Sequence, residues 1–213
     1  MAFPIAVLVS GRGTNLQSLL DHAGDRLRAR IAVVVSNTPG APALARAAAA
    51  GVPTAVVDHR GYRDRVAFED ALIAALDAHR PRLVVLAGFM RVLTPRFVGH
   101  YEGRLINIHP SLLPCFPGLD THARALAAGV ERHGATVHFV TAGVDEGPIV
   151  LQVTVPVLAA DTPEALAARV LEQEHRILPQ AVRWFAEGRL RCEAGGARLD
   201  GRPAHEVARL EDF

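Results

Sequence analysis

Short apolar runs alternate with amphipathic stretches along the first half of the chain. The runs are rich in Val, Ile, Leu and Ala and predict buried strands at residues 5–10, 31–36, 54–57, 83–87 and 105–109. Helical spacing between them predicts helices ending at about residue 21 and spanning residues 42–50 and about 63–78. Strands that are apolar throughout and alternate with helices are typical of a parallel sheet covered on both faces. We therefore expect a doubly wound, Rossmann-like α/β fold.

The pattern changes from residue 135 onward. Residues 136–141 and 149–157 alternate apolar and polar side chains, and only a short turn joins them. That turn is too short for a helical crossover, so this side of the mostly parallel sheet should end in antiparallel strands. A last helix should begin at Thr162-Pro163-Glu164 and stop at Gly188. Residues 1–213 are expected to form a single domain, with a small hairpin around Gly195-Gly196 and a tail in residues 189–213.

Composition narrows the classes of function. The chain has 213 residues, 50% hydrophobic and 21% charged, which is ordinary for a folded protein. Its net charge of +1 gives no general attraction to nucleic acid or to an anionic membrane. The apolar opening is too short to span a membrane and lacks a basic leader, so a cytoplasmic location is expected.

The residue types also exclude some kinds of chemistry. There is no lysine, which excludes a Walker A motif and Schiff-base chemistry. Two cysteines and ten histidines without metal-ligand spacing predict no metal.

The most informative segment is residues 105–114, Leu-Ile-Asn-Ile-His-Pro-Ser-Leu-Leu-Pro. In a strand, Asn107 and His109 project from one face, whereas Ile106 and Ile108 project from the other. Pro110 ends the strand, which leaves His109 at the carboxyl edge of the sheet. Ligands of open α/β sheets bind at that edge.

An amide and a cationic imidazole on one wall can both donate to a developing oxyanion. Asp145, in a Gly-flanked turn, is the candidate carboxylate, and its charge is expected to raise the pKa of His109. The alternative is that these are polar groups that only satisfy nearby backbone, with Asp145 as an ordinary turn residue. Cys115 could be a nucleophile, but its proline-rich surroundings favour a packing role.

A second candidate site is the loop Gly11-Arg12-Gly13-Thr14-Asn15, between the first strand and the first helix. Backbone N–H groups at a helix N-terminus suit a phosphate, although an ordinary structural turn is also open. The loop departs from G-x-G-x-x-G, and the second strand ends in Ser36-Asn37 without the acid that binds a ribose in NAD-dependent enzymes. These two features argue against an NAD-dependent oxidoreductase.

Several motifs together resemble the phosphoribosylglycinamide formyltransferase family. They run in order from about residue 5 to residue 200: residues 10–16, Leu86-Ala-Gly-Phe-Met-Arg91, Asn107-Ile-His-Pro-Ser-Leu-Leu-Pro114, Gly134-x-x-Val-His-Phe-Val140 and Gln173-Glu-His175. The resemblance implies transfer of a formyl group from 10-formyltetrahydrofolate to the amino group of glycinamide ribonucleotide in purine biosynthesis. It also implies roles for Asn107 as oxyanion donor, His109 as cationic proton source and Asp145 as the group that keeps His109 protonated.

The resemblance further implies how the two small-molecule substrates bind. Gly13, Thr14 and Asn15 would bind the phosphate of the ribonucleotide, and Glu174 its glycinamide or ribose part. The folate site would consist of Asn107 and of Arg65, Met90, Arg91, Val92, Leu93 and residues 141–145. Cys115 and Asp120 depart from the basic and polar residues common in the family, and Arg124 is a candidate to replace the lost charge.

Three other readings remain open. A formyltetrahydrofolate deformylase shares the Asn-His-Asp set but admits water, and usually carries an extra N-terminal domain. A methionyl-tRNA formyltransferase is longer, with a C-terminal tRNA-binding domain. A non-catalytic nucleotide-binding module would leave the Asn107, His109 and Asp145 set unexplained. No nucleic-acid or membrane partner is expected, and the protein should be a monomer or a homodimer.

Overall fold

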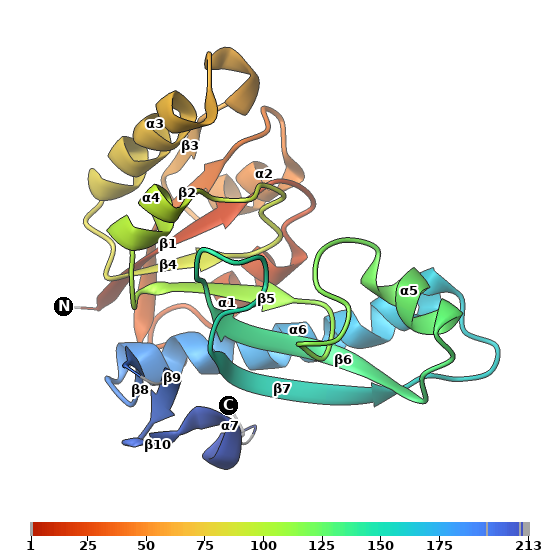
Figure 1. The fold of residues 1–213 in the computed structure, drawn as a ribbon. Helices are drawn as coiled ribbons and strands as arrows, with labels where there is room; N and C mark the ends of the chain where they lie inside the picture. The colour runs from red at the N-terminus through yellow and green to blue at the C-terminus, as the bar shows by residue number, and fades with distance from the viewer. Residues whose placement is uncertain (1, 195, 209, 211–213) are drawn as a thin grey trace.

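The computed structural model describes residues 2–194, 196–208 and 210. A seven-stranded sheet has the order β3-β2-β1-β4-β5-β6-β7 (Figure 1). Its strands are β1 (Phe3–Val9), β2 (Ala29–Ser36), β3 (Thr54–Val56), β4 (Leu83–Leu86), β5 (Leu105–His109), β6 (Arg132–Phe139) and β7 (Ile149–Pro156). The first five pair in parallel, whereas β6 pairs antiparallel with both β5 and β7. The predicted mixed, doubly wound α/β sheet is therefore confirmed.

Helices cover both faces of this sheet. They are α1 (Thr14–Asp21), α2 (Pro42–Ala49), the short 3-10 turn η1 (His59–Gly61), α3 (Arg65–Asp77), α4 (Pro95–His100), α5 (Thr121–Ala127) and α6 (Pro163–Ala186). The alternation along β1 explains the two layers, because Ile5, Val7 and Val9 join one core cluster with α1, α2 and α6. Ala6 and Leu8 join the other cluster with α3 and α4. Figure 1 shows α6 running along the sheet on the side away from α3 and α4.

The C-terminal part adds a second, three-stranded antiparallel sheet. It contains β8 (Leu190–Glu193), β9 (Gly196–Leu199) and β10 (Arg202–Pro203), followed by α7 (Ala204–Val207). The predicted hairpin is present, with Gly195 outside the described residues. A third strand and a helix follow where the sequence indicated only a tail, of which residues 211–213 also lie outside the described residues.

Glycines end two of the predicted helices. Gly51 and Gly188 have φ values of +69° and +77°, in the left-handed region that closes helices without a Cβ penalty. Three α-helices of the described residues were not predicted: α4, capped by Thr94, α5, which follows the loop after β5, and the C-terminal α7. Strand β6 also begins at Arg132, earlier than the alternation at residue 136 indicated. Within the described ranges, no helix is long and apolar enough to cross a membrane.

Candidate active site

The carboxyl edge of the parallel strands carries a cavity of about 500 Å³. The loop after β4 lines one side, with Met90, Arg91, Val92 and Leu93, and the end of β5 lines another, with Asn107 and His109. Ser10, at the end of β1, fixes the first of these loops because its Oγ accepts a hydrogen bond of 2.8 Å from the Met90 backbone N–H. The folate-lining residues predicted in 90–93 thus share one cavity with the predicted catalytic pair.

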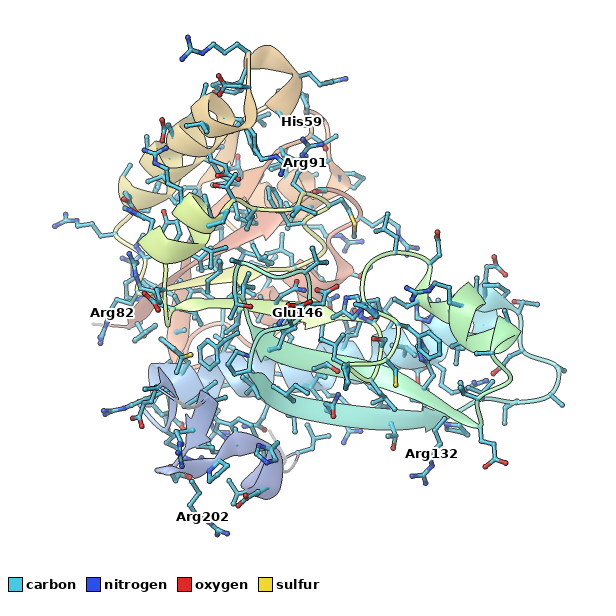
Figure 2. The ribbon with its side chains drawn as sticks, in the orientation of Figure 1. His59, Arg82, Arg91, Arg132, Glu146 and Arg202 are labelled. Carbon is cyan, nitrogen blue, oxygen red and sulfur yellow. The ribbon has the colours of Figure 1, made fainter. Side chains whose placement is uncertain are left out.

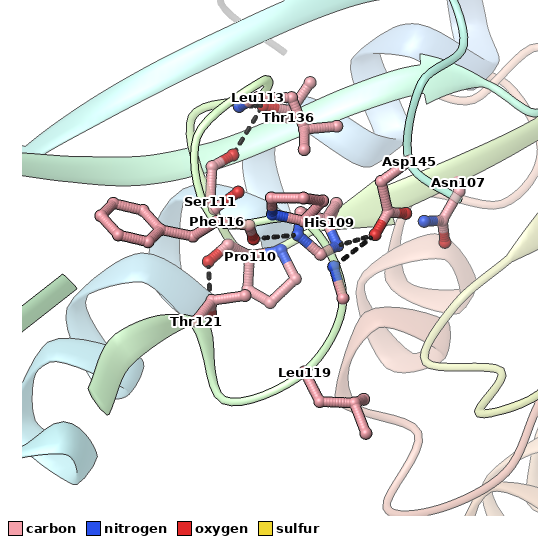
Figure 3. Close-up of polar contacts among 12 residues, drawn as sticks. Asn107, His109, Pro110, Ser111, Leu113, Phe116, Leu119, Thr121, Thr136 and Asp145 are labelled. Carbon is pink, nitrogen blue, oxygen red and sulfur yellow. Dashed lines mark hydrogen bonds and ion pairs between the residues drawn. The ribbon is translucent and has the colours of Figure 1, made fainter. Parts of the chain in front are cut away.

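Asn107 and His109 lie on the same side of β5, as the alternation predicted. Ile106 and Ile108 belong to the core cluster of the other face. Asp145 reaches them from the loop between β6 and β7, and Figure 3 shows its carboxylate between His109 and Asn107. Asp145 Oδ2 lies 3.3 Å from His109 Nδ1. The three predicted catalytic side chains therefore meet at one wall of the cavity.

Backbone groups of residues 110–121 complete the surroundings of this pair. His109 Nε2 lies 3.1 Å from the Phe116 carbonyl oxygen, and the Gly118 N–H donates to Asp145 Oδ2 at 2.9 Å. Both nitrogens of the His109 ring thus face an acceptor, which suits an imidazolium because that form donates from both. The side chain is only 6% exposed, however, and burial opposes its charge.

For His109, burial has a larger effect on the pKa than the two acceptors. Its pKa lies below the ordinary value because desolvation outweighs the stabilisation by the Phe116 carbonyl and Asp145. Asp145 does raise this pKa, as expected, but by less than burial lowers it, so the expectation that Asp145 keeps the ring cationic is wrong. Burial also opposes the charge of Asp145, but hydrogen bonds from His138 and Gly118 outweigh it and the Asp145 pKa is lowered. A neutral imidazole beside an ionised carboxylate is the resting state near pH 7.

His138 is a member of the site that sequence reasoning missed. It is the cross-strand partner of Asn107 in the β5–β6 pair. Its Nε2 lies 3.2 Å from Asn107 Nδ2 and 3.5 Å from Asp145 Oδ1, so it connects two of the three side chains predicted to be catalytic. The segment Val137-His138-Phe139 was recognised only as part of the resemblance. The strand register, which the sequence does not reveal, is what places His138 in the cavity.

A separate pair of predicted residues meets at the N-terminus of α1. Asn15 Nδ2 donates to Glu174 Oε2 at 2.6 Å, although 159 positions separate the two residues. Glu174 is buried, and burial raises its pKa. The Asn15 Oδ1 atom is buried and has no hydrogen-bond partner among the described residues. This place offers the buried Asn15 Oδ1, beside Glu174, as an acceptor to a ligand that carries a donor.

The loop before α1 approaches α2 closely. Gly13 has a φ of +73°, and a Cβ added there would lie 2.5 Å from the Ala43 Cβ. No side chain of the described residues caps α1, and its first turn contains no acid. The backbone N–H groups of this turn thus remain available to an anion. The residues that line the cavity at the sheet edge do not include Gly13, Thr14, Asn15 or Glu174, nor Arg65, which begins α3.

The departures from the family pattern lie in the loop after β5. Cys115 is an exposed free thiol. Asp120 precedes α5 in a left-handed conformation with a φ of +55°. Arg124 donates to carbonyl groups of the same loop. Across the described part of the chain, no group of three or more His, Cys, Asp or Glu side chains is arranged to bind a metal ion.

Comparison with known proteins identifies the family. Residues 4–182 match the formyl transferase family. The chain is 48% identical over 199 residues to the phosphoribosylglycinamide formyltransferase of Escherichia coli (strain K12), covering 93% of this chain and 94% of that protein. The chain belongs to the phosphoribosylglycinamide formyltransferase family. The motifs quoted from its sequence are thus those of a true relative.

Solved structures agree with this assignment. The phosphoribosylglycinamide formyltransferase of Coxiella burnetii is 47% identical and superposes with a TM-score of 0.92, covering 95% of this chain and 96% of that one. A formyltetrahydrofolate deformylase of Pseudomonas syringae has the same fold, with a TM-score of 0.86, but is only 28% identical. The superposition covers 93% of this chain and 66% of the deformylase chain. The chain is thus much more similar in sequence to the formyltransferases than to the deformylase.

Proposed function

We propose that this protein, as a member of its family, transfers the formyl group of 10-formyltetrahydrofolate to the amino group of glycinamide ribonucleotide. The products are N-formylglycinamide ribonucleotide and tetrahydrofolate. The observation that carries the proposal is the meeting of Asn107, His109 and Asp145 at one cavity wall, in a chain whose relatives have this activity by name.

The amino group is already a competent nucleophile, so the reaction requires no covalent intermediate on the protein. Attack on the formyl carbon places negative charge on the formyl oxygen. Asn107 lines the cavity, and its Nδ2 can donate to that oxygen in exchange for its contact with His138. The contribution of Asn107 is thus greatest in the transition state, where this charge is present.

The reaction also moves a proton from the attacking amine to N10 of the folate. A neutral His109 can accept the proton of the attacking amine, which makes the ring an imidazolium, and then deliver it to N10 as the bond from the formyl carbon to N10 breaks. Asp145, 3.3 Å from Nδ1, stabilises that cation while it exists. The lowered pKa of His109 fits this role, because a resting imidazolium could not accept the proton.

The ribonucleotide is proposed to bind at the N-terminus of α1. Backbone N–H groups of Gly13, Thr14 and Asn15 are available to its phosphate. The buried Asn15 Oδ1, beside Glu174, is complementary to an amino or hydroxyl group of the same ligand. The folate is proposed to occupy the cavity, against Asn107 and residues 90–93 and 141–145, with Arg65 and Arg91 as candidates for contacts with its anionic tail. Figure 2 shows Arg91 on the loop that follows β4.

Tetrahydrofolate release from 10-formyltetrahydrofolate, measured with and without glycinamide ribonucleotide, tests the proposal. We expect release only when the ribonucleotide is present. Release at an equal rate without it would replace the proposed activity by that of a deformylase. Binding of both ligands without turnover would favour the non-catalytic alternative.

A further inference from the structure

The segment between β5 and α5 serves the active site through its backbone rather than its side chains. The Phe116 carbonyl oxygen faces His109 Nε2 at 3.1 Å, and the Gly118 N–H donates to Asp145 Oδ2 at 2.9 Å. A shift of this segment by an ångström would break both contacts, because hydrogen bonds weaken steeply with distance. The positions of His109 and Asp145 therefore depend on what fixes residues 116–119.

The local backbone does not fix this segment by itself. Phe116 and Asp120 both have a φ of +55°, in the left-handed region that side chains other than glycine seldom adopt. Such residues persist where contacts with the rest of the protein offset their cost. The contacts that stabilise this conformation must come from outside residues 116–120.

Arg124, on α5, supplies such contacts on both sides of Gly118. Its Nη1 donates to the Pro117 carbonyl at 2.5 Å and to the Leu119 carbonyl at 3.3 Å. Its guanidinium carbon also lies over the Phe116 ring, 5.7 Å from the centroid. One planar cation thus contacts three residues of the segment, Pro117 and Leu119 through hydrogen bonds and Phe116 through its ring face.

We propose that Arg124 is a positioning residue for the reaction: it fastens residues 116–119 so that their backbone maintains His109 and Asp145 in reactive geometry. The inference rests on the proposed formyl transfer. Arg124 acts through the backbone and does not itself touch the reacting atoms.

Arg124→Lys separates this role from a simple effect of charge. Lysine retains the positive charge, but its ammonium ends one bond short of Nη1 and cannot face the Phe116 ring as a plane. The titratable and charged groups that act on His109 stay in place: Asp145, His138, His122, His133 and the cation at position 124. If charge alone mattered, the substitution would change nothing.

We expect three changes in Arg124→Lys. Loss of one fixed hydrogen bond from a charged group corresponds to about a 10-fold fall in kcat and about 10-fold faster hydrogen exchange of the Gly118 amide. The titration midpoint of His109, followed by NMR of its ring, should fall because the Phe116 carbonyl that favours the protonated form is no longer fixed. Arg82→Lys is the matched control: Arg82 also places a guanidinium over an aromatic ring, 4.4 Å from the centroid of Phe3, but at the amino end of β4 (Figure 2).

Two results in Arg124→Lys would overturn the proposal. One is that both the hydrogen exchange of the Gly118 amide and the titration midpoint of His109 stay unchanged. The other is that the exchange changes while kcat does not. Equal losses in the Arg82 variant would overturn it as well, because they would reveal a general effect of removing a guanidinium. If the wild-type protein forms no formylated ribonucleotide, the proposed function fails. The exchange and His109 measurements need no substrate and still report whether Arg124 fixes the segment.

Discussion

Replacement of Asp145 by asparagine removes one charge from the active site and changes little else. The side chain keeps its size, and it is only 12% exposed in the structure. The Asp145 carboxylate is proposed to stabilise the imidazolium that forms on His109 while the proton moves. Without this carboxylate, the imidazolium forms in a buried position that lacks the negative charge that stabilises it.

The distance between the two groups sets the size of the effect. At the 3.3 Å that separates Asp145 Oδ2 from His109 Nδ1, an effective dielectric of about 20 gives an attraction of about 5 kcal/mol. The asparagine amide retains part of this attraction through its dipole, and water at the open side of the cavity stabilises part of the remaining charge. We therefore expect a loss of about 3 kcal/mol in the transition state, on the order of 100-fold in kcat.

The assay is steady-state kinetics, with kcat measured over a range of pH. Activity requires neutral His109 and falls as pH drops through its lowered pKa. Because Asp145 raises that pKa, Asp145→Asn should move the acidic limb to still lower pH while kcat falls. Glu146→Gln, which removes an equal charge from the exposed neighbouring position, is the control and should retain normal kinetics (Figure 2). A loss of less than about fivefold in Asp145→Asn, or an acidic limb that moves to higher pH, would refute the reasoning.

Three further predictions concern other parts of the site. Asn107→Ala should lower kcat by about 100-fold or more, as expected for removal of an oxyanion donor, and should weaken folate binding by a much smaller factor in a titration; weaker folate binding at normal kcat would contradict this role. Gly13→Ala should raise the KM for the ribonucleotide and destabilise the fold, since its Cβ would lie 2.5 Å from the Ala43 Cβ; an unchanged KM would separate this loop from substrate binding. Burial lowers the pKa of His133 to about 4, so the unfolded chain binds the extra proton as pH falls from about 6.5 to 4, and up to about 3 kcal/mol of stability is lost across that window. Denaturant unfolding should show this loss in the wild type and a smaller one in His133→Gln; equal pH slopes would contradict it.

The sheet was predictable because its signal is local. Each buried strand is an apolar run, and the alternation within β5 placed Asn107 and His109 on one face before any pairing was known. Helix α4 was missed although its signal was present: Thr94 caps it and Pro95 occupies its first position. With six residues and an apolar side formed by Phe97 and Val98, it is too short for helical periodicity to stand out.

The site was predictable only as far as side-chain identity reached. Contacts of His109 and Asp145 with the Phe116 carbonyl and the Gly118 N–H leave no trace in residue type, since every residue except proline carries the same backbone groups. The place of His138 depends on the register between β5 and β6. The direction of the His109 pKa depends on a balance between burial and two acceptors, which requires coordinates.

The central claim is that one formyl group passes directly from a folate nitrogen to the amine of the ribonucleotide, beside Asn107, His109 and Asp145. The most direct measurement supplies 10-formyltetrahydrofolate labelled with ¹³C in the formyl group, together with glycinamide ribonucleotide, and follows the label by NMR. The account predicts that the label appears on the glycinamide nitrogen in amounts equal to the tetrahydrofolate released, with His109→Ala strongly impaired. Label in free formate, or equal transfer by the His109 variant, would contradict it.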